Sequence, residues 1–325
     1  MGVHIESGST LRRDLSAVAN EFAAEEARRW GYIADRVAPV FPVAEADATY
    51  PVWCRENMLK RSATRRNEDG TYNRVDGTFG TQSYSCEEFG LETLLDDRRR
   101  RRFSSFLDFE RAMTRMLLHQ ILLDREIRLA AIVMNATTYS ATAASASWGT
   151  VGTDILGDVN SACVRLSGNT GIPRDMFSLI VSAATFWDLN RNTAILAQFS
   201  ATYSPNLGIR PGMLTAAQIA QVLNIGEIVV AGGSYDTKGE GVTESISTIW
   251  SDAYVQLCVL APPGSVMESP GAWRTLLWTP DSPTLPVVER YRSDERRGEV
   301  LRDRYDADEV ATAEADLMND LITMT

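Results

Sequence analysis

The spacing of apolar residues along the chain predicts a mixture of helices and strands. Helical spacing runs through residues 9–30, and a much longer apolar stripe runs through 106–136. Apolar runs of strand length recur further along, at 176–183, 227–233, 254–261 and 273–279. Together with the short helical segments between these runs, they predict a compact α+β unit over residues 154–279. The pattern after residue 285 predicts an antiparallel strand pair that turns at Arg297 and Gly298.

The long helix is predicted to begin near Phe106 and to bury a single stripe. The expected stripe consists of Phe109, Met113, Met116, Leu117, Gln120, Leu123, Ile127, Ala130, Ala131 and Met134. Charged residues, among them Asp124, Arg125 and Arg128, are expected to lie off the stripe. Some 30 residues at about 1.5 Å each would make a rod of about 45 Å, far longer than the usual helix of about 11–12 residues. A rod of this length is typical of a structural spine.

Before the long helix, residues 31–43 predict an extended arm. The segment GYIADRVAPVFPV is apolar, but it is too short to span a membrane. Pro39 and Pro42 interrupt it and favour extended backbone in the residues before them. We expect residues 31–60 to pack poorly within their own subunit. Contacts with other copies of the chain are expected at Trp30, Tyr32, Val40, Phe41 and Val43.

A long, projecting β-hairpin is predicted next, with strands at 50–57 and 79–89 and a polar tip at 65–77. A two-residue turn at Asp69 and Gly70 would place Cys54 and Cys86 nearly opposite each other. Directly opposed residues have Cβ atoms about 4.5–5.5 Å apart, and a disulfide needs about 3.5–4.5 Å, so proximity is favoured over a bond. A bulge, or a second turn signal at Val75, Asp76 and Gly77, would shift this register. Residues 137–153 are small and polar and are interpreted as a linker.

Composition and charge narrow the class of protein. At 44% hydrophobic and 23% charged residues, the 325-residue chain is globular rather than disordered. The net charge of −11 argues against a dedicated DNA-binding surface, which needs clustered cations. The N-terminus lacks the apolar region of a signal peptide, and none of the four cysteines forms a CxxC pair. These features indicate synthesis in the cytoplasm.

The one basic cluster is the run Arg98, Arg99, Arg100, Arg101 and Arg102. Five adjacent cations repel one another unless they are solvated or paired. Three readings stay open for this run: a solvated approach to the long helix, contact with acidic groups of a neighbouring chain, and contact with nucleic acid. Asp96 and Asp97 offer local pairing.

A search for catalytic motifs finds none. The only histidines are His4 and His119, and no serine is flanked like a nucleophile elbow. The glycine-rich segment 231–245 matches neither the dinucleotide nor the P-loop pattern. His119 is interpreted as a packing or surface residue. We therefore expect no enzyme activity, no catalytic residue, no cofactor and no metal site. An arm, a projecting hairpin and an overlong helix point instead to a protein that contacts copies of itself.

The order of these segments resembles the major capsid protein of tailed bacteriophages, whose shell fold is shared with herpesviruses and encapsulins. Four pieces carry the resemblance: the arm at 31–43, the loop strands at 50–57 and 81–97, the helix at 109–135, and the helix, strand and loop of 215–259. The resemblance implies an N-terminal arm (1–49), an extended loop (50–95), a peripheral domain with the spine helix (96–153 and 280–325) and an axial domain (154–279).

The resemblance also implies a function. The chain would self-assemble as hexamers and pentamers into an icosahedral shell around viral double-stranded DNA, located in the virion and assembled in the host cytoplasm. Its partners would be its own copies, with a portal, a cement protein and DNA held without sequence specificity, and no membrane. Many members carry a longer N-terminal scaffolding domain than the roughly 30 residues before the arm here. A separate scaffolding protein, or none, is therefore expected. The alternatives are an encapsulin shell and, more distantly, an α+β hydrolase that uses carboxylates.

Overall fold

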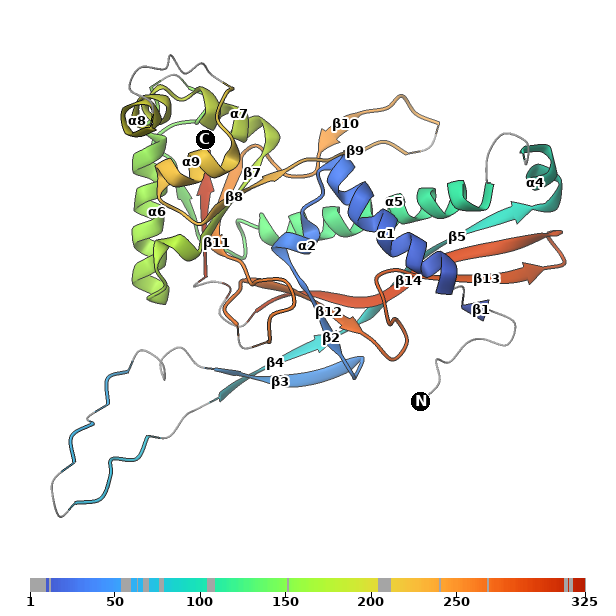
Figure 1. Cartoon of the computed structure of the whole chain (residues 1–325), viewed down its shortest axis with the longest axis horizontal. Helices are drawn as coiled ribbons and strands as arrows, with labels where there is room; N and C mark the ends of the chain where they lie inside the picture. The colour runs from blue at the N-terminus through green and yellow to red at the C-terminus, as the bar shows by residue number, and fades with distance from the viewer. Residues whose placement is uncertain are drawn as a thin grey trace.

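The molecule is elongated, with two sheet-centred halves and a hairpin that projects from one side (Figure 1). A computed structural model describes residues 10–11, 13–53, 60–62, 64–66, 70–75, 79–103, 109–150, 152–203, 212–239, 241–267, 269–312, 315 and 318–324. The long helix α5 (Phe109–Val133) extends from one half toward the other. At about 1.5 Å per residue its 25 residues span about 37 Å.

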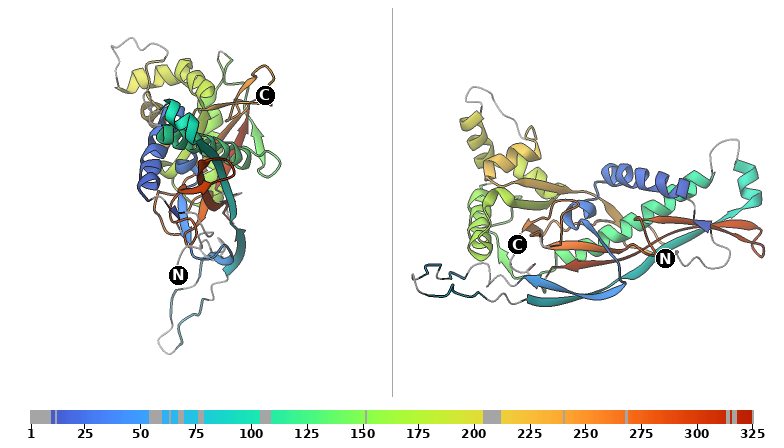
Figure 2. Two further views of the ribbon diagram at one scale, coloured as in Figure 1. Left: turned by 90° about the vertical axis from the view of Figure 1, so that its right-hand side faces the viewer. Right: turned by 60° about the horizontal axis from the view of Figure 1, so that its bottom comes forward.

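One half is built on a six-stranded sheet. Its strands in order are β1 (Thr10–Leu11), β13 (Val287–Ser293), β14 (Gly298–Ala311), β12 (Trp273–Trp278) and β2 (Val40–Val43), and β5 (Glu87–Asp96) also pairs with β14. All pairs are antiparallel except β12 with β2. Helices α5 and α1 (Arg13–Trp30) pack against each other and cover one face of this sheet. The short helix α4 (Asp97–Phe103) follows β5 at the far end (Figure 2).

The other half is built on a five-stranded sheet. The strand order is β6 (Ala141–Ala143), β15 (Asn319–Thr323), β11 (Tyr254–Val259), β7 (Phe177–Ser182) and β8 (Glu227–Ala231). Its helices are α6 (Ile155–Thr170), η1 (Arg174–Met176), α7 (Ala183–Arg191), α8 (Thr193–Tyr203) and α9 (Ala216–Leu223). A small hairpin, β9 (Ser234–Asp236) and β10 (Ile246–Thr248), precedes β11. The largest apolar cluster lies between this sheet and helices α6, α8 and α9.

Several local predictions are confirmed. The α+β class, the helix that ends at Trp30 and the strand pair after residue 285 all appear as expected. At α9, Thr215 accepts a hydrogen bond from the Gln218 N–H and the Gln218 side chain accepts one from the Thr215 N–H. Two further local features were not predicted: at α6, Asp154 caps the first turn and Gly171 ends the helix in the left-handed region, at φ 71°. These features are encoded within a few residues, so the sequence shows them directly.

The predicted buried stripe of the long helix is wrong. The buried residues of α5 are Thr114, Leu117, Leu118, Ile121, Leu122, Arg125, Glu126, Leu129, Ala130 and Val133. Only Leu117 and Ala130 belong to the predicted stripe, and Met116 is 42% exposed. The prediction placed charged residues outside, whereas Arg125 and Glu126 are buried with polar partners from other segments. The buried face of α5 is therefore rotated about the helix axis relative to the predicted stripe.

The predicted domain boundaries also differ from the sheets. Strand β5, assigned to the extended loop, pairs along its whole length with β14 in the six-stranded sheet. Strand β12, assigned to the axial domain, lies in the same sheet. Strand β15, assigned to the peripheral domain, lies in the five-stranded sheet between β6 and β11. Strand pairing joins residues far apart in sequence, so boundaries drawn along the chain miss it.

The segment interpreted as a linker, residues 137–153, is structured where it is described. It contains β6, and its Tyr139 and Trp148 are almost fully buried. The Trp148 indole N–H donates to Asp158 of α6 at 3.1 Å, and the Tyr139 hydroxyl accepts from the Trp273 indole at 2.9 Å. Two aromatic anchors therefore fix a stretch whose composition is otherwise typical of a flexible turn.

Candidate assembly surfaces

The beginning of the arm is held by a buried carboxylate of the long helix. Glu126 accepts hydrogen bonds from the N–H groups of Ile33 and Ala34, each at 2.9 Å, and from the Trp250 indole at 2.7 Å. The two backbone donors lie at the start of the short helix α2 (Ala34–Val37), where unpaired N–H groups favour a negative charge. Burial raises the pKa of Glu126, while the three donors and Arg125 oppose this shift. One side chain thus joins the arm, α5 and the segment before β11.

Two ion pairs add to this attachment. Arg125, also buried, donates to Asp35 of the arm at 2.6 Å and to the Thr275 hydroxyl of β12 at 3.2 Å. Arg36 pairs with Glu227 of β8, in the other half of the molecule. The arm is therefore tied to both sheets by charged groups as well as by apolar contacts.

A close crossing of two glycines lies at the first residue of the arm. Gly31 has φ +73°, and its carbonyl accepts from the Gly232 N–H at 2.8 Å. A Cβ on Gly31 would lie 3.0 Å from the Gly232 Cα, and one on Gly232 would lie 3.0 Å from the Trp30 carbonyl oxygen. The chain after β8 can pass this close to the end of α1 only because both residues lack a side chain.

The expectation that residues 31–60 pack poorly within their own subunit is wrong for the start of the arm. Ile33, Ala34, Val37 and Ala38 belong to a core cluster of the same chain. Strand β2 then pairs in parallel with β12, and Val40 packs against the cluster under α5. Apolar residues at positions 33, 34, 37 and 38 have the spacing of one helical turn. The prediction of an extended arm missed this turn because two prolines follow closely.

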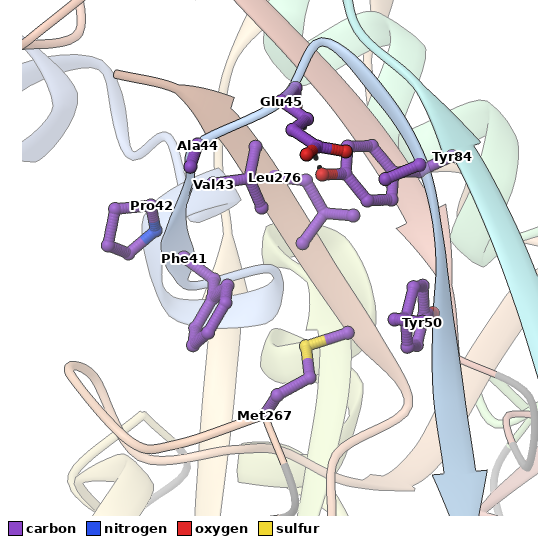
Figure 3. A pocket seen from close by; sticks show the side chains of 10 residues that line it. Phe41, Pro42, Val43, Ala44, Glu45, Tyr50, Tyr84, Met267 and Leu276 are labelled. Carbon is purple, nitrogen blue, oxygen red and sulfur yellow. Dashed lines mark hydrogen bonds between the residues drawn. The ribbon is translucent and has the colours of Figure 1, made fainter. Parts of the chain in front are cut away.

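Beyond Val40 the arm opens toward solvent and lines an apolar pocket of about 340 Å³ (Figure 3). Phe41, Pro42 and Val43 form one side, and Tyr50, Tyr84, Met267 and Leu276 form others. Phe41 and Val43 are only partly buried. Burial, with a smaller effect of Asp308, raises the pKa of Tyr50 to about 12, so its hydroxyl stays neutral. Of the predicted contact residues, Phe41 and Val43 are thus brought together on one apolar surface.

Trp30 and Tyr32 lie elsewhere, with their rings close to His119 of α5. The ring centroids of Trp30 and His119 are 4.8 Å apart, and those of Tyr32 and His119 are 6.0 Å apart and nearly parallel. The Trp30 indole donates to Glu26 at 2.9 Å, yet 45% of its surface is exposed. Burial lowers the pKa of His119 below its ordinary value, so the imidazole is neutral at pH 7. His119 is therefore a packing residue, and His4 lies outside the described residues.

Because His119 packs close to two aromatic rings, His119→Gln is expected to leave particle yield unchanged within a few-fold. The measurement is the mass of sedimenting particles per cell, compared with the unmodified chain. If the change instead removed a measurable hydrolytic activity from purified protein, the non-enzymatic reading would fail.

The hairpin of β3 (Asp47–Trp53) and β4 (Phe79–Ser85) projects from the body, as predicted (Figure 1). Its predicted register is wrong. Asp47 lies opposite Ser85, and the Cys86 N–H donates to the Ala46 carbonyl, so Cys86 continues the ladder opposite Ala46. Cys54 lies outside the described residues, and Cys86 is a free thiol. The described residues between the strands do not continue the ladder, and Asp69 of the predicted turn lies outside the described residues.

The arginine run forms helix α4. Asp96 accepts from the N–H groups of Arg98 and Arg99, and Asp97 pairs with Arg292 of β13 at 3.0 Å. Arg100 pairs with Glu299 at 3.0 Å and with Glu110 at 3.5 Å, within the subunit. The other arginines of the run are exposed. The run is therefore divided between an internal ion pair and a solvent-facing basic surface.

Within the described residues, no three histidine, cysteine or acidic side chains come together as they would around a metal ion. None of the described helices has the length and apolar character of a membrane span.

Comparison with known proteins identifies the fold. No protein-family model matches the sequence, and no curated protein matches it. Among solved structures, a phage-related protein from Bordetella bronchiseptica RB50 is 20% identical and superimposes with a TM-score of 0.71 over 97% of both chains. The capsid of cyanophage P-SCSP1u is 10% identical, with a TM-score of 0.60 over 90% of this chain and 87% of that one. A virus-like particle protein from Pyrococcus furiosus is 9% identical, with a TM-score of 0.55 over 99% and 100%.

The chain therefore has the fold of shell proteins, and specifically the fold of the capsid proteins of tailed bacteriophages. The predicted fold is confirmed.

Proposed function

We propose that this chain is a major capsid protein that assembles with its own copies into an icosahedral shell. The observation that carries the proposal is that the shell fold extends over nearly the whole chain, 90% of it in the cyanophage capsid comparison and 97% in the Bordetella one. The projecting hairpin and the partly exposed apolar pocket beside the arm are surfaces that a second copy could cover.

In this proposal, copies meet at the apolar surface of Phe41 and Val43, at the exposed side of Trp30, and at helix α4. Tyr32, Val40 and Arg100 contribute indirectly, because their side chains already pack or pair within the subunit. The two sheet-centred halves correspond to the axial and peripheral parts of a shell subunit. Burial of apolar surface contributes about 25 cal/mol per Å², and repetition around a closed shell multiplies modest contacts.

In this proposal the building units are hexamers and pentamers, and the shell encloses double-stranded DNA. The chain assembles in the host cytoplasm and is located in the virion. A portal and a cement protein are the further partners, with either a separate scaffolding protein or assembly without one. The proposed role is structural, without catalysis or a cofactor.

A nanocompartment of the encapsulin type is the second candidate. The observation in its favour is the full-length likeness to the Pyrococcus furiosus virus-like particle, which covers 99% of this chain. Such a shell would enclose protein cargo rather than a genome. The remote alternative, an α+β hydrolase, gains nothing from these likenesses.

Electron microscopy of the full chain, expressed alone and purified, tests the proposal. We expect closed, regular particles, because the contact surfaces belong to the subunit itself. Particle diameter separates the candidates: large shells favour a phage capsid, and small shells favour a nanocompartment. A monomer that stays monomeric at high protein concentration and with crowding agents would contradict both.

A further inference from the structure

A buried aspartate on the six-stranded sheet has no hydrogen-bond partner for its carboxyl among the described residues. Asp303 is in the middle of β14, with Val288 of β13 on one side and Leu91 of β5 on the other. Its side chain is on the same face as Leu301 and Tyr305, which are two residues away in either direction. Leu301 packs under Leu117 of α5, and Tyr305 packs under Ile121. Asp303 therefore sits where the long helix covers the sheet.

The carboxyl has no compensating contact among the described residues. Its solvent exposure is 0%, and neither carboxylate oxygen has a hydrogen-bond partner. An ionised carboxylate in such a place is strongly unfavourable, and a group so buried normally takes up a proton instead. Burial alone raises the pKa of Asp303 to about 7.

The charged groups around Asp303 are engaged elsewhere. On β13 and β14, Arg290 and Glu299 pair with each other and Arg290 also pairs with Glu110 of α5. Further along the contact between α5 and the sheet, Arg125 of α5 pairs with Asp35 and lies near Glu309 of β14.

On the remaining elements, Glu26 of α1 binds Arg115, and Glu87 at the end of β5 is exposed. Arg302 and Arg304 of β14 project to the opposite face, where they pair with Glu92 and Glu289. None of these side chains forms a hydrogen bond with the Asp303 carboxyl.

We propose that Asp303 is a proton-binding site: the subunit folds with this carboxyl neutral, and release of the proton to solvent loosens the packing of α5 on the six-stranded sheet. The proposal does not depend on assembly, since every group involved belongs to one subunit. Because α5 also carries Glu126 and Arg125, which hold the arm, loosening of α5 would be transmitted to the arm.

The sign of the effect follows from linkage. Between pH 4 and pH 7 the folded chain keeps the Asp303 proton while the unfolded chain has lost it, so stability falls as pH rises through this window. Above pH 7 both states are ionised and the effect levels off. Asp306 acts in the same direction, since burial raises its pKa to about 6, so the test must isolate Asp303.

The experiment compares the full chain with Asp303→Leu and Asp303→Asn at several pH values. The equilibrium constant for unfolding of the unmodified chain, relative to either variant, is expected to rise about tenfold per pH unit from pH 4 to pH 7 and then to stay constant. Asp294→Asn, at a side chain that is 93% exposed, serves as the matched control and should show no such trend. Hydrogen exchange of α5 at pH 8 should be at least tenfold faster in the unmodified chain than in Asp303→Leu.

Infrared spectroscopy of the protein, with its aspartates isotope-labelled, reports the protonation of the carboxyl directly. This measurement does not require the unmodified chain and the variants to be equally stable. At pH 5.5 the band of a protonated carboxyl should be present in the unmodified chain and reduced in Asp303→Leu. A ratio of unfolding constants that does not change with pH would overturn the proposal. An ionised Asp303 at pH 5.5 would overturn it as well, even if one of the variants failed to fold.

Discussion

Replacing Glu126 with alanine is expected to destabilise the subunit by about 3–5 kcal/mol. The change leaves three buried N–H donors unpaired, at about 1–3 kcal/mol each, and water that enters the space of the side chain offsets part of this cost. The donors are those of Ile33, Ala34 and the Trp250 indole. The measurement is urea denaturation of the full chain, together with the rate of proteolysis within residues 31–43. Both should change together, because Glu126 holds the arm as well as the fold.

A matched control is Glu25→Ala in α1, a glutamate that is 66% exposed and only 3.8 Å from Arg115. Its expected loss is below about 1 kcal/mol, as for most exposed ion pairs. The loss of unfolding free energy in Glu126→Gln should fall between those of Glu126→Ala and Glu25→Ala. The amide oxygen of glutamine can still accept hydrogen bonds, but its NH₂ group faces a backbone donor. A loss below about 1 kcal/mol in Glu126→Ala would show that the arm is held by its apolar contacts alone.

Replacing Phe41 with aspartate is expected to abolish shell assembly while leaving the subunit folded. Phe41 is only partly buried at the pocket beside the arm, so the isolated subunit can keep the carboxylate in water. If a second copy covers this pocket, the unpaired carboxylate is buried at every interface, at several kcal/mol each. Electron microscopy and sedimentation report assembly, and circular dichroism with thermal unfolding reports the fold.

The control for this prediction is Phe41→Leu, which keeps an apolar side chain at the same position and should still assemble. Shells of normal size and yield from Phe41→Asp would show that the pocket is not an assembly contact. Unfolded Phe41→Asp protein would mean that the side chain supports β2 instead of a neighbouring copy.

The sequence indicated which elements form, because their signals are local. The capping box at Thr215 and the cap at Asp154 are set within four residues, and three strands of the five-stranded sheet, β7, β8 and β11, follow from short apolar runs. Strands β6 and β15 of the same sheet were not predicted. The order of the arm, loop and long helix was also sufficient to suggest the shell fold, which the solved structures confirm.

The structure places the predicted contact residues on different parts of the subunit. Phe41 and Val43 do reach an exposed apolar pocket, but Val40 faces the subunit's own core and Trp30 and Tyr32 pack on His119. The prediction of an extended arm relied on the spacing of the prolines, which indicates the backbone conformation but not the contacts of the side chains. Met267 of the pocket comes from a loop more than two hundred residues away, and no sequence signal pointed to it.

The sequence by itself determined most of the helices and strands and their order, since apolar periodicity and caps act over a few residues, but α2, β6 and β15 were not predicted. Only the tertiary structure decided which face of α5 is buried, because Arg125 and Glu126 can leave water only where Asp35, Thr275, Trp250 and the start of α2 supply their partners. The same holds for Asp303, which the sequence shows merely as one acidic residue among many. Its burial follows from β13, β5 and α5 closing around it, and long-range packing of that kind leaves no mark in the local pattern.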